Sequence, residues 1–354
     1  MFFVKREYRK FAKNSYNSFV LAGDIGGTNT NLGIFGIKKN SPEILISFHF
    51  KSKEIKGLNQ PISEVLEYAK NNSNIKITKA CFAVAGVLSN KKDYAKITNA
   101  KWNVNKSKLL NKTKLKNIIL INDFEAAGYG INMLNGKDIM AVKRAKKTTN
   151  GPVLVIGAGT GLGKSALLYD NYHKSYIPIP SEAGHSDFPV QNQQELQLVE
   201  FIKKNKKTGQ VSYEDVLSGR GLGSIYLFLR KNGKINPTKY TKEIGESKNQ
   251  AELISKYRKT DKTCMEAFKL FKTFYARFAR NFALDVLPYG GVYIAGGIAP
   301  KNTDIFDSEF VKIFEQNCKF AHILKKIPIY LVLNSNVGLL GAGFAGAKLI
   351  NGEK

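Results

Sequence analysis

Apolar and polar positions alternate along the first part of the chain in patterns that predict strands and helices in turn. Residues 20–37 (VLAGDIGGTNTNLGIFGI) hold two apolar runs around a Gly-Thr-Asn turn, which predicts a β-hairpin. Residues 44–50 predict a third strand, and the stretch that begins at Pro61 has helical spacing. The elements expected next are a strand at 76–86, a helix near 105–113, a strand at 117–123 and a helix at 124–133.

A second series of the same kind follows residues 134–150, a polar, lysine-rich stretch that we expect to be a connection. This series opens with a strand and glycine turn at 152–163 (PVLVIGAGTGLG), and the strand SALLYD comes next. The elements expected after it are helices near 193–205 and 216–230, a long helical stretch over about 248–285, strands at 290–299 and 327–333, and a helix at 337–350. Because both series open with a strand, a Gly-Thr turn and a strand, we predict two related α/β units.

The length of the chain agrees with two domains, since 354 residues exceed the roughly 100–200 residues of a typical domain. No stretch reaches the roughly 18 consecutive apolar residues that a membrane span needs. The first 19 residues are basic and aromatic and lack a continuous apolar run, so we do not expect a secretory signal. A transit peptide and a disordered or surface-packed extension both stay open for this segment.

Charge raises the question of a nucleic-acid partner, because 55 Lys and Arg face 28 Asp and Glu for a formal net charge of +27. The lysines are scattered along the whole chain, and no zinc-finger, helix-turn-helix or RNP-type motif accompanies them. We therefore interpret the charge as background composition and expect no specific nucleic-acid partner. A positive field would still attract an anionic nucleotide.

The three cysteines, Cys81, Cys264 and Cys318, do not stand at metal-ligand spacing. Cys81 falls in an apolar strand and is expected in the core. This usage fits a reducing compartment and does not indicate a structural zinc.

The first candidate for chemistry is the turn from Gly23 to Asn29. Glycines allow backbone N–H groups to approach a phosphate closely, and Asp24 beside them could orient metal-bound water. A plain hairpin turn is the alternative.

The second glycine loop, Gly157 to Ser165, comes close to the P-loop pattern but has Ala158 where that pattern needs glycine. A P-loop also requires a helix directly after Ser165. The segment that follows looks like a strand and then a loop with Pro178 and Pro180, so a strand–turn–strand phosphate cradle fits better. In that case Lys164 begins a strand.

A third glycine motif, Gly341 to Gly346, matches the dinucleotide pattern GxGxxG. No acidic residue can follow it at about 20 positions, as that fold requires. We interpret it as a helix face of small residues used for packing.

Polar residues at strand ends and in loops could carry the reaction. Asn122 and Asp123 end an apolar strand, where ligands of α/β sheets collect, although Asp is also a common helix N-cap. Glu182 and His185 lie in a loop flanked by proline and glycine, and could bind sugar hydroxyls or a metal. Glu214 stands at a helix start, where acidic residues are favoured in any case.

Each motif alone is ambiguous, but the motifs taken together in their order resemble a known family. The series GDIGGTNTN, ITNAKW, INDFEAAGYGI, GAGTGLG, SEAGHSDF, EDVLSGRGL, VYIAGGIAPK and NVGLLGAGF resembles the bacterial-type glucokinases of the hexokinase and actin-like ATPase superfamily. The match runs from about Val20 to Ala347.

The resemblance implies two actin-like (ribonuclease H-like) α/β domains around a central cleft. A small domain would combine residues 19–133 with 336–354, a large domain would hold 134–335, and 1–18 would be an N-terminal extension. A cysteine-rich zinc motif of a related branch does not follow His185 here, so no zinc is implied.

The resemblance also implies two sets of site residues. Those matching the sugar side are Asn122, Asp123, Glu182, His185 and Glu214, with Thr98 and Asn99 lining it. Those matching the ATP side are Gly23, Asp24, Gly26, Gly27, Thr28, Asn29, Gly157, Gly159, Thr160, Gly161, Gly296 and Gly297.

The activity implied is phosphorylation of glucose at its 6-hydroxyl by ATP, the first step of glycolysis, with Asp123 as general base. Mg²⁺ would assist without a direct protein cage, and Asp24 would reach it through water. The enzyme would be a cytoplasmic homodimer without a membrane or specific nucleic-acid partner.

Other interpretations stay open beside this one. A sugar-sensing regulator would need a helix-turn-helix before Val20, where the segment is too short to hold one. A P-loop kinase, a kinase of mannose or an amino sugar, and polyphosphate as the phosphoryl donor are further alternatives.

Overall fold

The computed structural model describes residues 3–9, 13–39, 41–98, 100–232 and 235–349, and it divides into two compact units. The prediction for Asn99 lies outside the described residues. The second unit comprises Gly136–Tyr169 and Ser181–Ser335. The first unit comprises Met1–Asn135, Asp170–Pro180 and Asn336–Lys354.

The first unit is built on a six-stranded sheet in the order β1-β4-β3-β2-β5-β9. The pairs β2–β5 and β5–β9 are parallel, and the other neighbours are antiparallel. These strands are β1 (Val4–Glu7), β2 (Ser18–Ile25), β3 (Asn29–Lys38), β4 (Ser41–Lys51), β5 (Lys79–Val84) and β9 (Asn117–Asn122). A smaller sheet in the order β6-β7-β8 consists of β6 (Gly86–Leu88), β7 (Tyr94–Ile97) and β8 (Asn103–Asn105).

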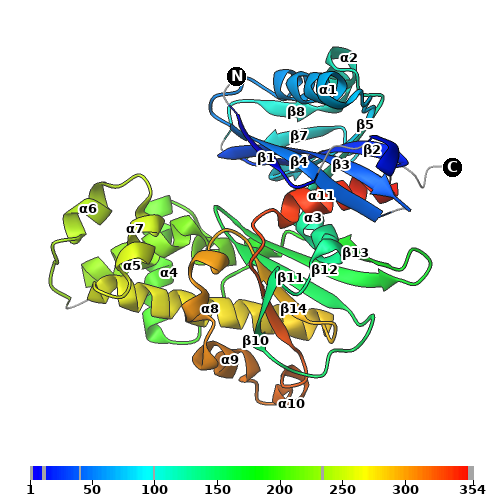
Figure 1. The fold of residues 1–354 in the computed structure, drawn as a ribbon. Helices are drawn as coiled ribbons and strands as arrows, with labels where there is room; N and C mark the ends of the chain where they lie inside the picture. Colours follow the sequence, from blue (N-terminus) through cyan, green and yellow to red (C-terminus); the bar gives the residue numbers. More distant parts are fainter. Residues whose placement is uncertain (1–2, 10–12, 40, 99, 233–234, 350–354) are drawn as a thin grey trace. The chain divides into compact units, whose positions relative to one another are not determined.

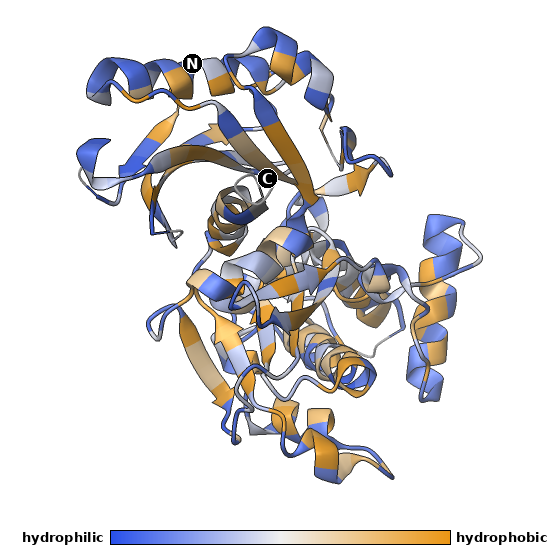
Figure 2. Ribbon diagram, turned by 90° about the vertical axis from the view of Figure 1, so that its right-hand side faces the viewer, coloured by the Kyte–Doolittle hydropathy of each residue, from blue (hydrophilic) through white to orange (hydrophobic). Residues whose placement is uncertain are grey.

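Helices cover both faces of the first sheet (Figure 1). The helical elements of this unit are η1 (Lys13–Ser15), α1 (Asn59–Ser73), α2 (Lys106–Lys112), α3 (Asp123–Gly130), η2 (Ile131–Met133) and α11 (Val337–Leu349). On one face, α1 buries Ile62, Val65 and Ala69, whose spacing of three and four residues places them on one side of the helix. Figure 2 shows the resulting alternation of hydrophilic and hydrophobic residues along this helix. On the other face, α3 and α11 pack over Val20 and Phe35.

The second unit contains most of a second six-stranded sheet, in the order β10-β15-β14-β11-β12-β13. Residues 170–180, which carry β13, group with the first unit. The strands are β10 (Ile139–Lys143), β11 (Val153–Ala158), β12 (Leu162–Asp170), β13 (Ser175–Ile179), β14 (Val292–Ala295) and β15 (Ile329–Val332). The helical elements are η3 (Ala183–His185), α4 (Gln193–Lys206), η4 (Tyr213–Asp215), α5 (Gly219–Asn232), α6 (Thr241–Glu246), α7 (Gln250–Tyr257), α8 (Lys262–Val286), η5 (Ala299–Lys301), η6 (Thr303–Ile305), α9 (Ser308–Glu315) and α10 (Ala321–Leu324).

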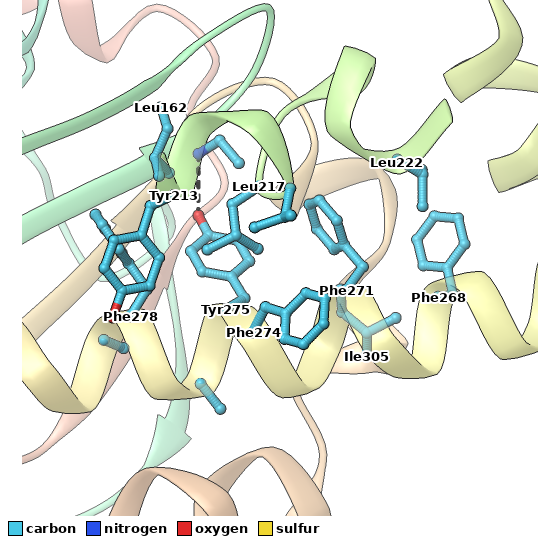
Figure 3. Packing of buried hydrophobic residues seen from close by; sticks show 14 of the residues in the cluster. Leu162, Tyr213, Leu217, Leu222, Phe268, Phe271, Phe274, Tyr275, Phe278 and Ile305 are labelled. Atoms are coloured by element: carbon cyan, nitrogen blue, oxygen red, sulfur yellow. Dashed lines mark hydrogen bonds between the residues drawn. The ribbon is translucent and has the colours of Figure 1, made fainter. Parts of the chain in front are cut away.

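An aromatic core lies along α8, which buries a row of rings against β11, α5 and η4. Figure 3 shows Phe268, Phe271, Phe274, Tyr275 and Phe278 projecting from this helix into the core. Edge-to-face ring pairs, which add a modest amount to burial, recur within it.

The same strand order occurs in both sheets, as the paired Gly-Thr turns predict. The series β4-β3-β2-β5-β9 corresponds to β13-β12-β11-β14-β15. In each, an antiparallel hairpin is followed by two parallel neighbours. The predicted α/β class with two related series is therefore confirmed.

Three expectations for individual segments need correction or refinement. Residues 134–150 are not merely a connection, because β10 lies within them and pairs with β15. The long helical stretch expected over 248–285 consists of two helices, α7 and α8, separated at residues 258–261. Residues 4–7 of the extension form β1, which pairs with β4 at the edge of the first sheet.

None of the described helices is long and apolar enough to cross a bilayer. Among the cysteines, Cys81 and Cys264 are buried and Cys318 is exposed.

Candidate active site

The end of β2 and the end of β9 lie along one edge of the first sheet. Across the parallel pairs, Ile25 is in register with Val84 and Val84 with Asn122. The glycine turn that follows β2 and the pair Asn122–Asp123 therefore stand two strand spacings apart, or roughly 10 Å. This is the edge at which α/β sheets bind ligands. Thr98, which is exposed, is tied to the same edge because its N–H donates to Ala85 O at 3.0 Å.

Local capping places Asp123 at the first position of α3. The side-chain oxygen of Asn122 accepts from the N–H groups of Phe124 (2.8 Å) and Glu125 (3.4 Å), and Glu125 Oε2 accepts from the Asn122 N–H. This capping box makes Asn122, and not Asp123, the N-cap. Asp123 is partly buried and accepts from the Phe124 N–H at 3.0 Å through Oδ1.

A lysine supports this helix start from the β6–β7 turn. Lys92 Nζ lies 3.1 Å from each carboxylate oxygen of Glu125, whose side chain is only 8% exposed. A buried carboxylate without a counter-charge would be costly. Lys92 therefore gives the buried Glu125, which completes the capping box beside Asp123, an ion-pair partner.

The turn between β2 and β3 is held by a serine from the end of β4. Gly26 N–H donates to Asn29 O at 2.9 Å across the turn. Ser52 Oγ donates to Gly26 O at 2.6 Å, and Ser52 N–H donates to Thr28 O at 3.0 Å. Hydrogen bonds from Ser52 thus stabilise the turn, and the side chains of Thr28 and Asn29 remain exposed to solvent.

Asp24 lies next to this turn in a desolvated environment. Burial raises the pKa of Asp24 to about 6, and a hydrogen bond from Asn31 acts in the opposite direction. Asn31 Oδ1 lies 2.7 Å from Nδ1 of His49, and burial and the charge of Arg6 lower the pKa of that histidine. A neutral His49 that donates from Nδ1 directs the Asn31 amide nitrogen toward Asp24.

The second glycine loop joins β11 to β12, and so the expected strand follows it instead of the helix that a P-loop needs. Gly159 N–H donates to Gly161 O at 2.8 Å across the loop. In Figure 3 the hydroxyl of Tyr275 points away from α8, and it accepts from the Ala158 N–H at 3.1 Å. Lys164, in β12, lies 3.0 Å from Asp285 Oδ2 and against the Phe282 ring, so it is engaged with α8.

The segment after β14 lies directly against this loop. Ile298 N–H donates to Ala158 O at 3.2 Å. Gly296 has a φ of +87°, and a Cβ there would stand 2.6 Å from Ala158 O, so only glycine fits without strain. The Gly157–Gly161 loop and the Gly296–Gly297 pair, predicted from separate motifs, are thus neighbours within the second unit.

The candidates for sugar binding in the second unit converge on Leu162, at the start of β12. Glu214 Oε2 accepts from the Leu162 N–H at 3.0 Å, and its Oε1 accepts from Arg220 at 3.0 Å. Gly184, between Glu182 and His185, packs so closely on Leu162 O that a side chain would overlap it. Glu182 Oε2 and His185 Nε2 are 3.9 Å apart, and both side chains are largely exposed.

Glu214 also lies close to Gly161, since a Cβ at this position would stand 2.7 Å from Glu214 Oε2 and would displace that carboxylate. Glu214 therefore joins the loop predicted for phosphate to the loop predicted for sugar. The sugar-binding role of Glu182, His185 and Glu214 stays a prediction.

Sequence reasoning missed the residues that support the site. Ser52, Tyr275 and Lys92 contact site residues that lie far from them in sequence, and no local pattern marks them. The capping box could have been found, because Asn122 followed three residues later by Glu125 is its signature.

No cluster of three or more His, Cys, Asp and Glu side chains with metal-binding geometry occurs within the part of the chain that the structure describes. The partly buried carboxylate of Asp24 beside the glycine turn is an oxygen ligand of the kind Mg²⁺ prefers. A cation near it would also offset the desolvation that raises its pKa.

Two sheets of the same strand order, each with a glycine hairpin turn, are the architecture of the actin-like ATPase fold, to which sugar kinases belong. The family model Glucokinase matches residues 21–349. The chain belongs to the glucokinase family and is an enzyme of that family.

Relatives of known name agree with this assignment. The glucokinase of Nostoc sp. is 35% identical over 348 residues, which cover 94% of this chain and 100% of the relative. The crystal structure of a glucokinase from an Antarctic psychrotroph has a TM-score of 0.76 at 26% identity and covers 93% of this chain and 98% of that chain. A glucokinase of Balamuthia mandrillaris in complex with glucose has a TM-score of 0.77 at 22% identity, with 93% of each chain covered, and shows the fold.

Proposed function

We propose that this enzyme transfers the γ-phosphoryl group of ATP to the 6-hydroxyl of glucose, with Asp123 as general base. The products are glucose 6-phosphate and ADP. The observation that carries the proposal is the position of Asp123 at the end of β9, on the sheet edge that also bears the glycine turn after β2. The glucose named in the relatives' descriptions supports the choice of sugar.

In the proposed step, the sugar oxygen O6 attacks the γ-phosphorus and its proton passes to the Asp123 carboxylate. A new bond forms between O6 and phosphorus, the bond from phosphorus to the β,γ-bridging oxygen breaks, and its electrons leave with ADP. Such transfers depend mainly on positioning and charge stabilisation. Asp123 is suited to accept the proton because α3 and its capping box fix the start of the helix.

The triphosphate would be held by backbone N–H groups of the two glycine turns, at residues 26–29 and 157–161, with Gly296 and Gly297 beside the nucleoside. Asp24 would hold Mg²⁺ through water. When bound, that ion would neutralise charge on the phosphates.

The residues that would bind sugar hydroxyls are Glu182, His185 and Glu214, and Asn122 and Thr98 are further candidates for sugar binding. Because Oδ1 of Asn122 caps α3, its Nδ2 is the end available to donate to a sugar oxygen. Sites built for hydroxyls reject analogues that lack them by up to about 10⁴–10⁵. For deoxyglucoses that lack a contacted hydroxyl, kcat/KM should therefore fall far below its value for glucose. Equal kcat/KM values for all of these sugars would refute the proposed role of these residues in binding hydroxyls.

The test of the proposal is steady-state kinetics of Asp123→Asn, assayed by ADP release with a panel of hexoses. We expect kcat to fall by about 10²–10⁴ while nucleotide still binds. Glu67→Gln, which removes an exposed carboxylate from α1, is the matched control and should keep full activity. Near-normal turnover of Asp123→Asn would refute the base, and absence of ADP release from the wild type with every hexose would favour a sugar-sensing regulator.

We propose in addition that the enzyme works as a cytoplasmic homodimer that supplies glycolysis, as the resemblance to bacterial-type glucokinases suggests. Sedimentation and cell fractionation test this assignment. A monomer at working concentration, or recovery with a membrane fraction, would contradict it.

A further inference from the structure

A hollow of about 440 Å³ lies in the first unit, between the loop before α1 and the edge formed by β7, β8 and α2. Figure 1 shows α1, α2, β7 and β8 grouped together in this unit. Its lining includes neither the proposed base nor any residue predicted to bind sugar or ATP. The hollow is therefore separate from the residues proposed to bind sugar and ATP.

The lining is positively charged. Lys56, Lys108 and Lys112 line it, all three are exposed, and no Asp or Glu is among the lining residues. Three like charges around one hollow repel one another, and an anion in their midst would relieve that repulsion.

The N-terminus of α1 opens on the same hollow. Gly57, Leu58 and Asn59 line it, and α1 begins at Asn59. This 15-residue helix has no side-chain cap at its start and no acidic residue in its first turn. Because Pro61 has no N–H and the Ile62 N–H donates to Leu58 O, the N–H groups of Asn59 and Gln60 are the donors at this end of the helix, and no side chain caps them. Phosphate is an anion that such helix ends bind.

Aromatic and amide groups complete the surface. Trp102, which is 9% exposed, and Tyr94 contribute planar aromatic rings to the lining, and Asn103, in β8, contributes an amide. This combination suits a small molecule that bears a phosphate and has an organic body, although inorganic pyrophosphate shares the essential charge.

The hollow is connected to the glycine turn by a short chain of hydrogen bonds. Trp102 Nε1 donates to Ser52 O at 3.0 Å, and Ser52 Oγ donates to Gly26 O at 2.6 Å. A ligand that shifts the indole would therefore disturb the residue that fixes the turn proposed to hold ATP.

We propose that this hollow, defined by Lys56, Lys108, Lys112, Trp102 and the N-terminus of α1, is a second binding site for a small phosphate-bearing molecule. The chain offers a direct reporter, since Trp102 is its single tryptophan.

The experiment is a fluorescence titration of the full-length protein, without Mg²⁺ or substrates, at constant ionic strength. The probes are inorganic pyrophosphate and ribose 5-phosphate, which separate a bare phosphate ligand from a phosphate ester with a sugar body. Saturable change with either probe is expected, and whichever binds more tightly identifies the kind of ligand.

The decisive variant is Lys56→Ala/Lys108→Ala/Lys112→Ala. Its matched control, Lys204→Ala/Lys269→Ala/Lys312→Ala, removes the same charge from exposed positions of the second unit. The first should weaken binding by about tenfold or more, because charge-assisted hydrogen bonds are lost, and the control by less than about twofold.

If both triple variants bind the probe equally weakly, the net charge of the protein explains the binding. If both bind it as tightly as the wild type, the probe binds elsewhere, as at the glycine turns. Either result overturns the proposal, as does binding of a mixed-sequence oligonucleotide without binding of either probe. The substituted lysines are exposed, so the variants should fold, and thermal melting checks this. Calorimetry on Trp102→Phe measures binding independently of the tryptophan fluorescence. Heat of pyrophosphate binding that survives in Trp102→Phe supports the site, and its loss in the lysine variant confirms the location.

Discussion

Lys92 forms an ion pair with the buried side chain of Glu125, and Glu125 in turn accepts a hydrogen bond from the N–H of Asn122, next to the proposed base. Lys92→Met should lower the free energy of unfolding by about 1–3 kcal/mol, since a buried carboxylate loses its partner. It should also lower kcat, because the start of α3 positions Asp123. Urea unfolding and steady-state kinetics measure the two effects.

Two variants control this prediction. Lys91→Met, at the exposed neighbouring position, should change neither quantity. In Lys92→Met/Glu125→Gln the charge that needs a partner is absent, so part of the stability should return. A double variant less stable than Lys92→Met alone would contradict the pairing.

Asp24 predicts a specific dependence of stability on pH. Its pKa is raised to about 6 in the folded state, above the ordinary value of 3.8, so between these pH values the folded state binds more protons than the unfolded state. The free energy of unfolding should therefore fall as pH rises from about 4 to about 6, by up to about 3 kcal/mol, and then level off.

The measurement is urea unfolding of the wild type and Asp24→Asn across this range. The variant cannot ionise, so its stability relative to the wild type should rise between about pH 4 and pH 6 and stay constant above. A difference that does not change with pH would show that the carboxyl of Asp24 titrates normally.

Substitution of Lys164 distinguishes between two modes of nucleotide binding, that of a P-loop and that of the strand–turn–strand phosphate cradle. Its ammonium is engaged with Asp285 and the Phe282 ring, so Lys164→Met should change kcat/KM by less than about tenfold, or about 1.4 kcal/mol. Asp24→Ala should cost far more. Kinetics of both variants at saturating Mg²⁺ check this, and the reverse ranking would favour a P-loop mode of binding.

At the scale of elements, the local patterns predicted the hairpins and most helices, because glycine turns and apolar periodicity are encoded within a few residues. They placed Asp123 and both glycine loops correctly at strand ends. Contacts such as that of Tyr275 with Ala158, 117 residues apart, depend on tertiary packing and leave no local trace.

The failures have particular physical causes. Residues 134–150 look like a polar connection because polar residues and lysines flank the short strand β10, whose sequence is IMAVK. Lys143 at its end is only 9% exposed on its side chain and donates to the carbonyl oxygens of Leu324 and Ile327 at 2.9 Å each. The helix over 248–285 breaks because buried Asp261 caps α8, accepting from the Cys264 N–H at 2.8 Å. In both cases a polar residue that would be expected on the surface is largely buried and forms its hydrogen bonds inside the fold.

The small-residue face predicted for α11 gives a prediction at this scale. A Cβ at Gly341 would overlap Ala126 O on α3. Gly341→Ala should therefore separate the two helices, lower stability by about 3 kcal/mol or more and reduce kcat through displacement of Asp123. Thermal unfolding and kinetics measure this.

Gly245→Ala is the matched control, since a Cβ at this helical position meets no other atom within 4 Å. Alanine there should leave activity unchanged and stabilise the protein by up to about 1 kcal/mol. Equal losses in both variants would refute the role of the α3–α11 contact.

At the scale of the whole molecule, the charge of +27 predicts weak association with nucleic acid and no sequence preference. Binding of mixed-sequence DNA should be visible at about 50 mM salt and fall by about 10³ or more at about 200 mM. Titrations at both salt concentrations check this. A sequence-dependent Kd near about 10⁻⁸ M at physiological salt would contradict it.

The repeated strand order suggests how the chain evolved. β9 leads into α3 and β15 leads into α11, so the two strand ends occupy equivalent places in two copies of one pattern. Duplication and end-to-end fusion of a shorter gene would produce this arrangement. With Asp123 as the proposed base, only one copy needs a proton acceptor: the first carries Asp123 after its last strand, whereas the second carries Asn334 and Asn336. An ancestor with identical halves would have had two equivalent places for a base, and under the proposed function the present chain uses one of them.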